Sequence, residues 1–373
     1  MLGSRKLRAA VIGTGGIAQQ SHVPALKSAA DEVEVVAAVD VDADRLARFQ
    51  ATNLIETGYR DVAEMLTSEK PDLVHVCTPP AAHVAPVEQC LRAGAWVLVE
   101  KPACLSLAEF DRIAAAETEG GAYASIVCQH RFGSAGRHAA ELLSSGELGR
   151  PLVADCRTTW YRGHDYYEVP WRGKWRTEGG GPTMGHGIHQ MDLLLALLGD
   201  WAEIRAMAAR LDRDVETEDV SVASVRFESG AVASIVNSVL SPRQESYIRI
   251  DCTDATVELT HLYGYGNEDW RYTPAEHVTD PARIGRWRTP PGQERSSHAA
   301  QLERVLDAMR DGRRPPASGA DARRTMELVT GLYRSALTGT SVRRADLTAE
   351  DPFYHDLHGE VPDWAPTREG AEA

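Results

Sequence analysis

The segment Gly13-Thr14-Gly15-Gly16-Ile17-Ala18 constrains the fold more than any other part of the sequence. It fits the pattern G-x-G-x-x-A and follows an apolar run at 7–12 that predicts a buried strand. Gly13 permits a tight turn, Gly15 lets a pyrophosphate approach the backbone, and Ala18 keeps the following helix close to the strand. The N–H groups at the start of that helix face the phosphates. We therefore predict a dinucleotide-binding turn with contacts from Gly13, Gly15, Gly16, Ile17 and Ala18.

Strand and helix patterns alternate through the first third of the chain. After 7–12, strands are predicted at 33–39, 73–77, 96–99 and 122–127. The predicted helices lie between them, at about 16–30, 42–50, 61–68, 80–93 and 106–119. This alternation predicts a parallel, doubly wound sheet with helices on both faces, which together with the glycine turn indicates a Rossmann domain.

The pattern changes near Arg131, where one helix is followed mostly by strands with period-2 alternation. They are predicted at 152–161, 202–211, 219–227, 231–239, 246–251 and 255–260, with a strong helix at about 182–198 between the first two. Two more helical stripes follow the strands. We therefore expect an α+β domain with a large, mostly antiparallel open sheet. A chain of 373 residues suits two domains, which we place at 1–128 and 129–373, with no firm assignment for the tail at 351–373.

The formal net charge of −14 argues against a nucleic-acid partner, which would require a basic face, and against an anionic membrane surface. No apolar run approaches the ~18 residues needed to span a bilayer, and the N-terminus lacks the apolar core of a signal peptide. The six cysteines are scattered without a C-x-x-C pair, which predicts reduced thiols. We therefore expect a cytoplasmic protein with no membrane partner.

A carboxylate stands where the adenosine ribose of a dinucleotide would bind. Asp40 ends the second predicted strand, about 20 residues after the glycine turn. It would accept hydrogen bonds from the ribose hydroxyls and repel a 2′-phosphate, which favours NAD, although Arg45 nearby keeps NADP open. Thr78-Pro79-Pro80 and Glu100-Lys101-Pro102 follow two further strands. Because ligands bind at the carboxyl ends of such strands, we expect Lys101 near the nicotinamide end.

The helix predicted at 182–198 begins in a glycine-rich stretch. Gly185 and His189 lie four residues apart and share one face. Each glycine costs roughly 1 kcal/mol of helix stability relative to alanine, so we expect something to approach the backbone closely. His189 is either a satisfied core histidine or a general acid/base, because the pKa of histidine lies near working pH. His186 and His189 form H-x-x-H, but no third ligand has zinc-like spacing, and we expect no metal.

The segment from Tyr161 to Trp175 is dense in aromatic and cationic residues. Flat aromatic faces and charged donors suit sugar rings and polyols, while the same residue types are also common in loop packing and subunit contacts. The candidate substrate-binding residues are Lys101, His186, His189, Trp171, Arg172 and Trp175.

In combination, these motifs resemble the glucose–fructose oxidoreductase, inositol dehydrogenase and rhizopine catabolism (Gfo/Idh/MocA) family of NAD(P)-dependent oxidoreductases. The resemblance covers nearly the whole chain. It rests on the glycine turn, on the loops at Thr78 and Glu100 with His83 between them, and on three later motifs. These are Gln129-His130-Arg131-Phe132, Gly179-Gly180-Gly181, and Gly187-Ile188-His189 with Asp192 after it.

The resemblance implies transfer of a hydride between nicotinamide and a sugar, polyol or sugar derivative. It implies that Lys101 contacts cofactor and substrate and stabilises the alkoxide, while His189 exchanges a proton with the substrate hydroxyl. The open face of the second sheet commonly forms a subunit interface in this family, which implies a homodimer or homotetramer. The expected cofactor contacts outside the glycine turn are Asp40, Thr78, Pro79, His83, Glu100, Lys101 and Gln129.

The sequence departs from the family at one position. Many members carry an Asp four residues before the histidine, as part of a Lys–Asp–His triad, whereas this chain has Gly185 followed by His186. Either His186 orients the substrate, or a residue of the Tyr161–Trp175 segment fills the gap, or catalysis is weak or lost. The retention of Lys101 and His189 favours the first two. Two other functions also stay open, an elimination enzyme that retains NAD and oxidises its substrate transiently, and a regulator that binds NAD and sugar without turnover.

Overall fold

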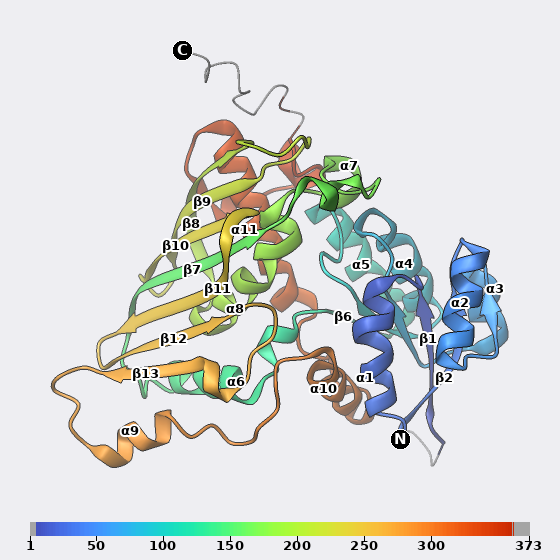
Figure 1. The fold of residues 1–373 in the computed structure, drawn as a ribbon, viewed down its shortest axis with the longest axis horizontal. Helices are drawn as coiled ribbons and strands as arrows, with labels where there is room; N and C mark the ends of the chain where they lie inside the picture. The colour runs from blue at the N-terminus through green and yellow to red at the C-terminus, as the bar shows by residue number, and fades with distance from the viewer. Residues whose placement is uncertain (1–4, 360, 362–373) are drawn as a thin grey trace. The chain divides into compact units, whose positions relative to one another are not determined.

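The structure is a computed structural model that describes residues 5–359 and 361. The chain divides into two compact units (Figure 1). Unit 1 comprises Met1–Val127 and Ser297–Arg323, and unit 2 comprises Cys128–Ser296 and Arg324–Ala373. This division differs from a single boundary after residue 128, because Ser297–Arg323 groups with unit 1. Of the tail at 351–373, residues 360 and 362–373 lie outside the described residues.

Unit 1 contains a six-stranded sheet in the order β3-β2-β1-β4-β5-β6, with every neighbouring pair parallel. The strands are β1 (Leu7–Ile12), β2 (Val33–Val39), β3 (Gly58–Tyr59), β4 (Leu73–Val76), β5 (Trp96–Val99) and β6 (Ala124–Ile126). The helices are α1 (Val23–Ser28), α2 (Ala43–Asn53), α3 (Val62–Glu69), α4 (Val84–Arg92), α5 (Leu107–Gly120) and α10 (His298–Asp311). This confirms the predicted Rossmann sheet. The strand order reverses between β1 and β4, which is where such sheets bind ligands.

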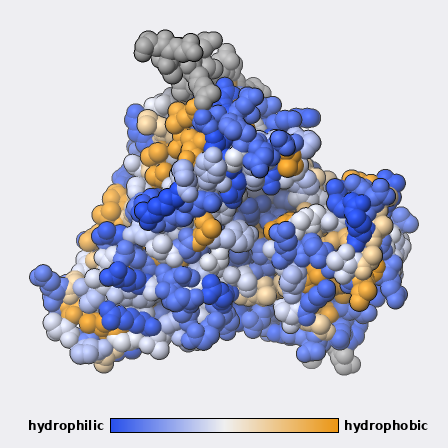
Figure 2. All heavy atoms as spheres, viewed as in Figure 1, coloured by the Kyte–Doolittle hydropathy of each residue, from blue (hydrophilic) through white to orange (hydrophobic). Residues whose placement is uncertain are grey.

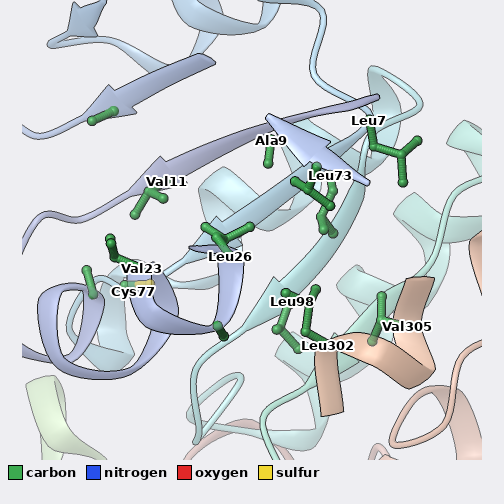
Figure 3. Packing of buried hydrophobic residues seen from close by; sticks show 14 of the residues in the cluster. Leu7, Ala9, Val11, Val23, Leu26, Leu73, Cys77, Leu98, Leu302 and Val305 are labelled. Atoms are coloured by element: carbon green, nitrogen blue, oxygen red, sulfur yellow. The ribbon is translucent and has the colours of Figure 1, made fainter. Parts of the chain in front are cut away.

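The core of unit 1 joins the sheet to α1 and to the late helix α10. Figure 3 shows Leu302 and Val305 of α10 beside Leu98 of β5. Val305 and Leu98 are completely buried. Burial of a leucine or valine side chain contributes roughly 1.5–3 kcal/mol, so the apolar stripe of α10 stabilises the attachment of this distant segment to unit 1.

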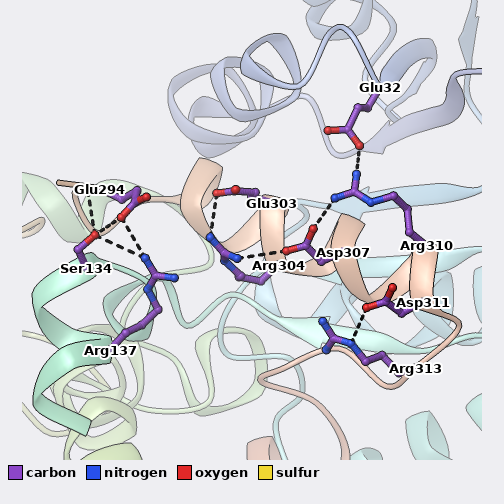
Figure 4. A network of polar contacts seen from close by, with 10 residues as sticks. All are labelled: Glu32, Ser134, Arg137, Glu294, Glu303, Arg304, Asp307, Arg310, Asp311 and Arg313. Atoms are coloured by element: carbon purple, nitrogen blue, oxygen red, sulfur yellow. Dashed lines mark hydrogen bonds and ion pairs between the residues drawn. The ribbon is translucent and has the colours of Figure 1, made fainter. Parts of the chain in front are cut away.

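The polar side of α10 carries ion pairs that are exposed to solvent. Arg310 pairs with Glu32 and with Asp307, and Arg304 lies 3.2 Å from Asp307 (Figure 4). Exposed pairs of this kind contribute little stability. The apolar stripe, rather than the charges, therefore accounts for the attachment of α10.

Unit 2 contains an eight-stranded sheet in the order β13-β12-β11-β7-β10-β9-β8-β14. The strands are β7 (Pro151–Tyr161), β8 (Trp201–Ala209), β9 (Val220–Phe227), β10 (Val232–Ser238), β11 (Leu240–Cys252), β12 (Ala255–His261), β13 (Trp270–Pro274) and β14 (Val342–Arg343). All neighbours are antiparallel except β10 and β7, which are parallel. The prediction of a mostly antiparallel sheet is confirmed.

The helices of unit 2 are α6 (Ser134–Ser144), α7 (Trp175–Glu178), α8 (Ile188–Leu198), α9 (Pro281–Trp287), α11 (Gly319–Thr338) and α12 (Pro352–His355). Helix α8 packs on one face of the sheet, against β7 and β11, and α6 packs on α8. A wider turn, Thr183–Gly187, leads into α8. The buried carboxylate of Glu218 accepts the N–H groups of Gly181 at 2.9 Å and Thr183 at 3.0 Å. These hydrogen bonds satisfy two backbone N–H groups at the start of the turn that leads into α8.

The opposite face of the unit 2 sheet carries exposed apolar side chains. Met207 of β8 is paired with Val222 of β9, and Val232 of β10 is paired with Val153 of β7. Their exposed fractions run from 43% to 73%. Elsewhere, hydrophilic groups cover much of the visible surface (Figure 2). Among the described residues, no helix has the length and apolar character needed to cross a membrane.

Candidate functional site

The glycine turn of unit 1 has the geometry of a phosphate cradle. Gly13 has a φ of +86°, and a Cβ there would lie 2.8 Å from the carbonyl carbon of Cys77. The backbone conformation and the close approach both require glycine. A Cβ at Gly15 would meet nothing within 4 Å, so the space over this residue is open. Ala18 is fully buried. The turn therefore fits a dinucleotide pyrophosphate.

Asp40 anchors this turn to the end of β2. Its carboxylate accepts the Thr14 N–H at 2.8 Å, the Thr14 hydroxyl at 2.7 Å and the Arg45 Nε–H at 2.9 Å. Burial by itself raises the pKa of Asp40, but the hydrogen bonds from Arg45, Asp42 and Thr14 outweigh it and hold the pKa well below the usual range. Asp40 is therefore an ionised acceptor at the predicted ribose position, with Arg45 already beside it.

His83 connects the loops that follow β4 and β5. Its Nε2 lies 2.6 Å from the Thr78 carbonyl oxygen, and its Nδ1 lies 2.7 Å from the Pro102 carbonyl oxygen. The ring is buried, and burial lowers its pKa. Pro79 is exposed beside Thr78. His83 thus has the contacts of a residue that fixes these two loops against each other.

Glu100 is held by a chain of buried histidines. Its Oε1 lies 2.9 Å from His22 Nε2 and 2.9 Å from His298 Nε2, and its Oε2 accepts the Lys101 N–H at 3.1 Å. His22 Nδ1 in turn lies 2.9 Å from His75 Nδ1. Burial raises the pKa of Glu100, but the bonds to His22 and His298 outweigh it and keep the pKa well below the usual range. The ionised carboxylate therefore fixes the backbone at Lys101.

The histidines around Glu100 also raise the question of a metal site. Within the described residues, one set of three side chains could hold a metal ion, namely His22, Glu100 and His298, whose ligand atoms lie within 4.8 Å of one another. The hydrogen bonds just described account for this arrangement. Among the described residues, neither His186 nor His189 belongs to such a set of three potential ligands.

Gln129 begins the first turn of unit 2 and is 2% exposed. Neither its side-chain nitrogen nor its side-chain oxygen has a hydrogen-bond partner among the described residues. An unsatisfied buried amide costs about 1–3 kcal/mol. A ligand that bonded to this amide would recover that free energy, which suits the predicted role in cofactor binding.

The protein itself makes most of the close approaches to the glycine-rich stretch. A Cβ at Gly181 would collide with the carbonyl oxygen of Glu218, and a Cβ at Gly187 would collide with the Asn237 side chain. These glycines therefore allow the stretch to pack on the strands. Gly185 is different, because a Cβ there would meet only Glu178 Oε1, at 3.6 Å.

Glu178 was missed by sequence reasoning. It is the last residue of α7 and is 6% exposed, and it accepts the Gly173 N–H at 2.6 Å. Its carboxylate lies beside the position at which the resemblance would place an Asp. The distance along the chain hid this relationship, because Glu178 precedes Gly185 by seven residues and lies just outside the segment from Tyr161 to Trp175.

His189 is buried on α8 among other rings. Its ring centroid lies 5.0 Å from that of His130 and 5.8 Å from that of Tyr263. Asp192, one turn further along, pairs with Arg131 through an Nε–Oδ2 contact of 2.6 Å. Asp192 therefore forms an ion pair with Arg131. This is a structural role, and it differs from the proton exchange predicted for His189.

Three of the predicted substrate residues meet in one cluster. We define the arginine–aromatic cluster as Arg162, Tyr166, Trp171, Arg172 and His186. Arg162 Nε lies 3.2 Å from His186 Nε2, and Arg172 Cζ lies 3.7 Å from the centre of the Tyr166 ring and 4.6 Å from that of Trp171. The cluster therefore combines flat apolar faces with two cations.

Trp175 lies outside this cluster. Its indole N–H donates to the Glu216 carbonyl oxygen at 3.0 Å, and its ring packs 5.1 Å from the ring of Tyr333. These contacts belong to the packing of α7 on α11. Of the predicted substrate residues in unit 2, Trp175 has the clearest structural role.

Comparisons with known proteins agree across the chain. Residues 7–127 match the oxidoreductase family with an NAD-binding Rossmann fold, and residues 137–258 match the GFO/IDH/MocA C-terminal domain. D-apiose dehydrogenase from Paraburkholderia graminis is 27% identical over 93% of this chain and 92% of its own length. D-glucoside 3-dehydrogenase from Escherichia coli is 26% identical over 91% of this chain and 98% of its own length.

A solved structure shows the same relationship. The WlbA dehydrogenase from Bordetella pertussis, in complex with NADH and UDP-GlcNAcA, has a TM-score of 0.81 and 26% identity, covering 91% of this chain and 99% of its own. The two family matches together span more than half of the chain, in the order of the two units. The chain belongs to the Gfo/Idh/MocA family of NAD-binding oxidoreductases.

Proposed function

We propose that this protein is an NAD-dependent dehydrogenase or reductase that acts on a CH–OH group of a sugar, polyol or sugar derivative. The observation that carries the proposal is the open cradle over Gly15, with the ionised Asp40 anchoring the same turn. The relatives named above are dehydrogenases of D-apiose and of D-glucosides, which supports the substrate class.

NAD, when bound, supplies the hydride acceptor or donor for such a reaction. We assign the Lys101 ammonium to stabilisation of the negative charge that develops on the substrate oxygen. Glu100 supports this role, because its carboxylate fixes the Lys101 backbone N–H while its other oxygen contacts two buried histidines. We assign His189 to the exchange of a proton with the substrate hydroxyl.

Glu178 takes the place of the missing Asp in this proposal. Its carboxylate lies 3.6 Å from the point at which a side chain on Gly185 would begin, and Gly185 precedes His189 by four residues. We assign this buried carboxylate to favouring the protonated form of the His189 imidazole. We therefore prefer a catalytic protein to one whose activity is lost.

We propose NAD over NADP because of the charge of Asp40. A 2′-phosphate would meet this ionised carboxylate, whose pKa is held low by Arg45 and Thr14. Arg45 supplies one positive charge at the same place, but it already donates two hydrogen bonds to Asp40. We also assign Thr78, Pro79 and Gln129 to cofactor contacts, and His83 to holding the loops that follow β4 and β5.

We infer a homodimer or homotetramer formed through the open face of the unit 2 sheet. Met207, Val222, Val232 and Val153 expose apolar area on that face. A second copy would remove this area from water. Light scattering of wild type and of Val222→Arg tests the assignment, and a wild-type monomer at micromolar concentration would overturn it.

The activity is tested with a panel of sugars and polyols, with NAD and NADP, in both directions, by following nicotinamide absorbance. We expect turnover of at least one panel member with NAD. Lys101→Ala and His189→Ala are each expected to lower kcat by about 10²-fold or more. Lys27→Ala and His164→Ala are the matched controls, since both residues are exposed.

Two results would contradict the proposal. Failure to turn over any panel member, while NAD binds tightly, would remove the dehydrogenase assignment. Normal turnover by both the Lys101 and His189 variants would leave a dehydrogenase but refute the proposed roles of these residues.

A further inference from the structure

The arginine–aromatic cluster has more positive charge than its surroundings balance. Arg162 Nε contacts His186, and Arg162 Nη1 donates to the Tyr161 carbonyl oxygen at 2.8 Å and lies 3.5 Å from Gln244 Oε1. All three partners are imidazole or amide groups. Among the described residues, the nearby carboxylates of Glu178 and Asp212 pair with Arg172 and Arg213 rather than with Arg162. This is unusual in a chain with a net charge of −14.

The Arg172 guanidinium group also has few hydrogen-bond and ion-pair partners. Its Nε is buried and has no hydrogen-bond partner among the described residues. Its nearest carboxylate is that of Glu178, 3.9 Å from Nη1, and Glu178 already accepts the Gly173 N–H. The Arg172 side chain is 23% exposed, so water reaches only part of it. Burial lowers the pKa of Arg172 and of Arg162, which reflects the cost of placing these cations there.

Both guanidinium groups flank one aromatic ring. Arg172 Cζ lies 3.7 Å and Arg162 Cζ lies 5.3 Å from the centre of the Tyr166 ring. Cation–π contacts recover part of the desolvation cost, but the two cations still repel each other. An oxyanion placed between them would relieve this repulsion and satisfy their N–H donors.

We propose that the arginine–aromatic cluster is an anion-binding subsite, and that the substrate is a sugar derivative carrying a carboxylate or phosphate group. The two arginines bind the oxyanion, since the guanidinium fork matches two oxygens of either group. Trp171 and Tyr166 provide flat faces for the sugar ring. His186, which contacts Arg162 and lies next to Gly185, is placed to contact the same ligand. This inference rests on the proposed function and narrows its substrate class.

The test uses the full-length protein saturated with NAD and three matched ligands, D-glucose, D-glucuronate and D-glucose 6-phosphate. Affinity is measured by calorimetry and kcat/KM by nicotinamide absorbance, at constant ionic strength. We expect at least one anionic ligand to bind about tenfold or more tightly than D-glucose. The comparison of glucuronate with the phosphate ester distinguishes the two sources of the oxyanion.

Arg162→Gln and Arg172→Gln are expected to lower the ratio of anionic to neutral affinity by about tenfold. Arg176→Gln is the control, because Arg176 is an exposed cation four residues after Arg172, in α7. It is expected to leave the ratio unchanged. Far-UV circular dichroism and thermal melting of each variant show that the fold is intact.

The possible outcomes separate this inference from the proposed function. Equal affinity for the three ligands, or an equal loss in the Arg176 variant, overturns the anion subsite even when neutral sugars are oxidised. Anion binding that depends on Arg162 and Arg172, without oxidation of any sugar, supports the subsite and overturns the dehydrogenase. An anionic preference in both binding and turnover supports both.

Discussion

Glu178 Oε1 lies 3.6 Å from the point at which a side chain on Gly185 would begin. The two residues come from different segments, since Glu178 ends α7 and Gly185 lies in the turn that leads into α8. A carboxylate is therefore present beside Gly185, four residues before His189, although the turn itself does not supply it. We propose that this carboxylate takes the part of the acidic group that the family resemblance leads us to expect at position 185.

The first prediction concerns this replacement. Glu178→Gln keeps an oxygen that can accept the Gly173 N–H, so the fold should be retained while the charge is lost. We expect kcat to fall by about 10²-fold, as it does when a catalytic group loses its positioning. The measurement is the pH profile of kcat and of kcat/KM, with the substrate identified in the panel. A loss caused only by structural damage would leave the shape of the profile unchanged.

Gly185→Asp provides the complementary test. In the Glu178→Gln background it restores one carboxylate, and part of the lost activity should return. In the wild-type background it places two carboxylates together, which raises the pKa of one of them and lowers activity at neutral pH. Wild-type activity in the Glu178→Gln single variant would show that this carboxylate has no part in the reaction.

The second prediction separates two glycines of the same turn. Gly15→Ala adds a methyl group where nothing lies within 4 Å, so stability should change little. The same methyl group fills the space assigned to the pyrophosphate, and the Kd for NAD should rise about tenfold or more, the equivalent of about 1.4 kcal/mol. Calorimetric titration with NAD gives the Kd, and thermal melting gives the stability.

Gly13→Ala is the contrasting variant. Its φ of +86° and the 2.8 Å approach of the Cys77 carbonyl carbon both oppose a side chain, so the free energy of unfolding should fall by more than about 1 kcal/mol. If Gly15→Ala also destabilised the protein, or bound NAD normally, the space over Gly15 would not be the cofactor cradle.

Much of the fold could be predicted from local patterns. The Rossmann strands are short apolar runs, and β1, β2 and β5 have the predicted limits. The two-residue strands β3 and β14 are too short to produce a periodic signal. The parallel pairing of β10 with β7, and the return of α10 to unit 1, depend on contacts between distant segments. Periodicity within a short window contains no information about such contacts.

The residues of the candidate site could likewise be predicted where they depend on local spacing, but not where they depend on contacts between distant segments. The roles of Gly13 and Asp40 follow from local spacing, because a turn and the end of the next strand are fixed by the fold. The partners of Glu100 could not be predicted, since His298 is 198 residues away in sequence. Density of glycines correctly predicted a close approach to the backbone. It did not reveal that the carbonyl oxygen of Glu218 and the side chain of Asn237 make that approach.

The third prediction follows from the buried histidines of unit 1. Burial lowers the pKa of His75 and His22 below the value of 6.5 that the unfolded chain retains. The unfolded state therefore binds more protons below pH 6.5, so stability is present above that pH and is lost as the pH falls. Each histidine adds a slope of up to about 1.4 kcal/mol per pH unit.

Urea unfolding between about pH 5 and 7 measures this slope. His75→Asn should make the dependence shallower, by up to one proton. His164→Asn is the control, since its side chain is 72% exposed, and it should leave the slope unchanged. An identical slope in wild type and in the His75 variant would show that this histidine takes up its proton equally well in the folded state.

The fourth prediction concerns the ion pair between Arg131 and Asp192, which ties the first turn of unit 2 to α8. The Arg131 and Asp192 side chains are 10% and 2% exposed, and Asp192 also accepts the Thr325 hydroxyl at 2.9 Å. Arg131→Leu alone leaves a buried carboxylate without its counter-charge, and should lower the free energy of unfolding by about 3–5 kcal/mol. The double variant Arg131→Leu with Asp192→Leu should cost less, because no charge stays buried. Glu203→Gln removes the partner of the exposed Arg226 and serves as the control, with little expected change.

Chemical unfolding of the wild type and of these three variants measures the differences in the free energy of unfolding. A double variant as unstable as the single one would show that Arg131 and Asp192 stabilise unit 2 through packing rather than through charge.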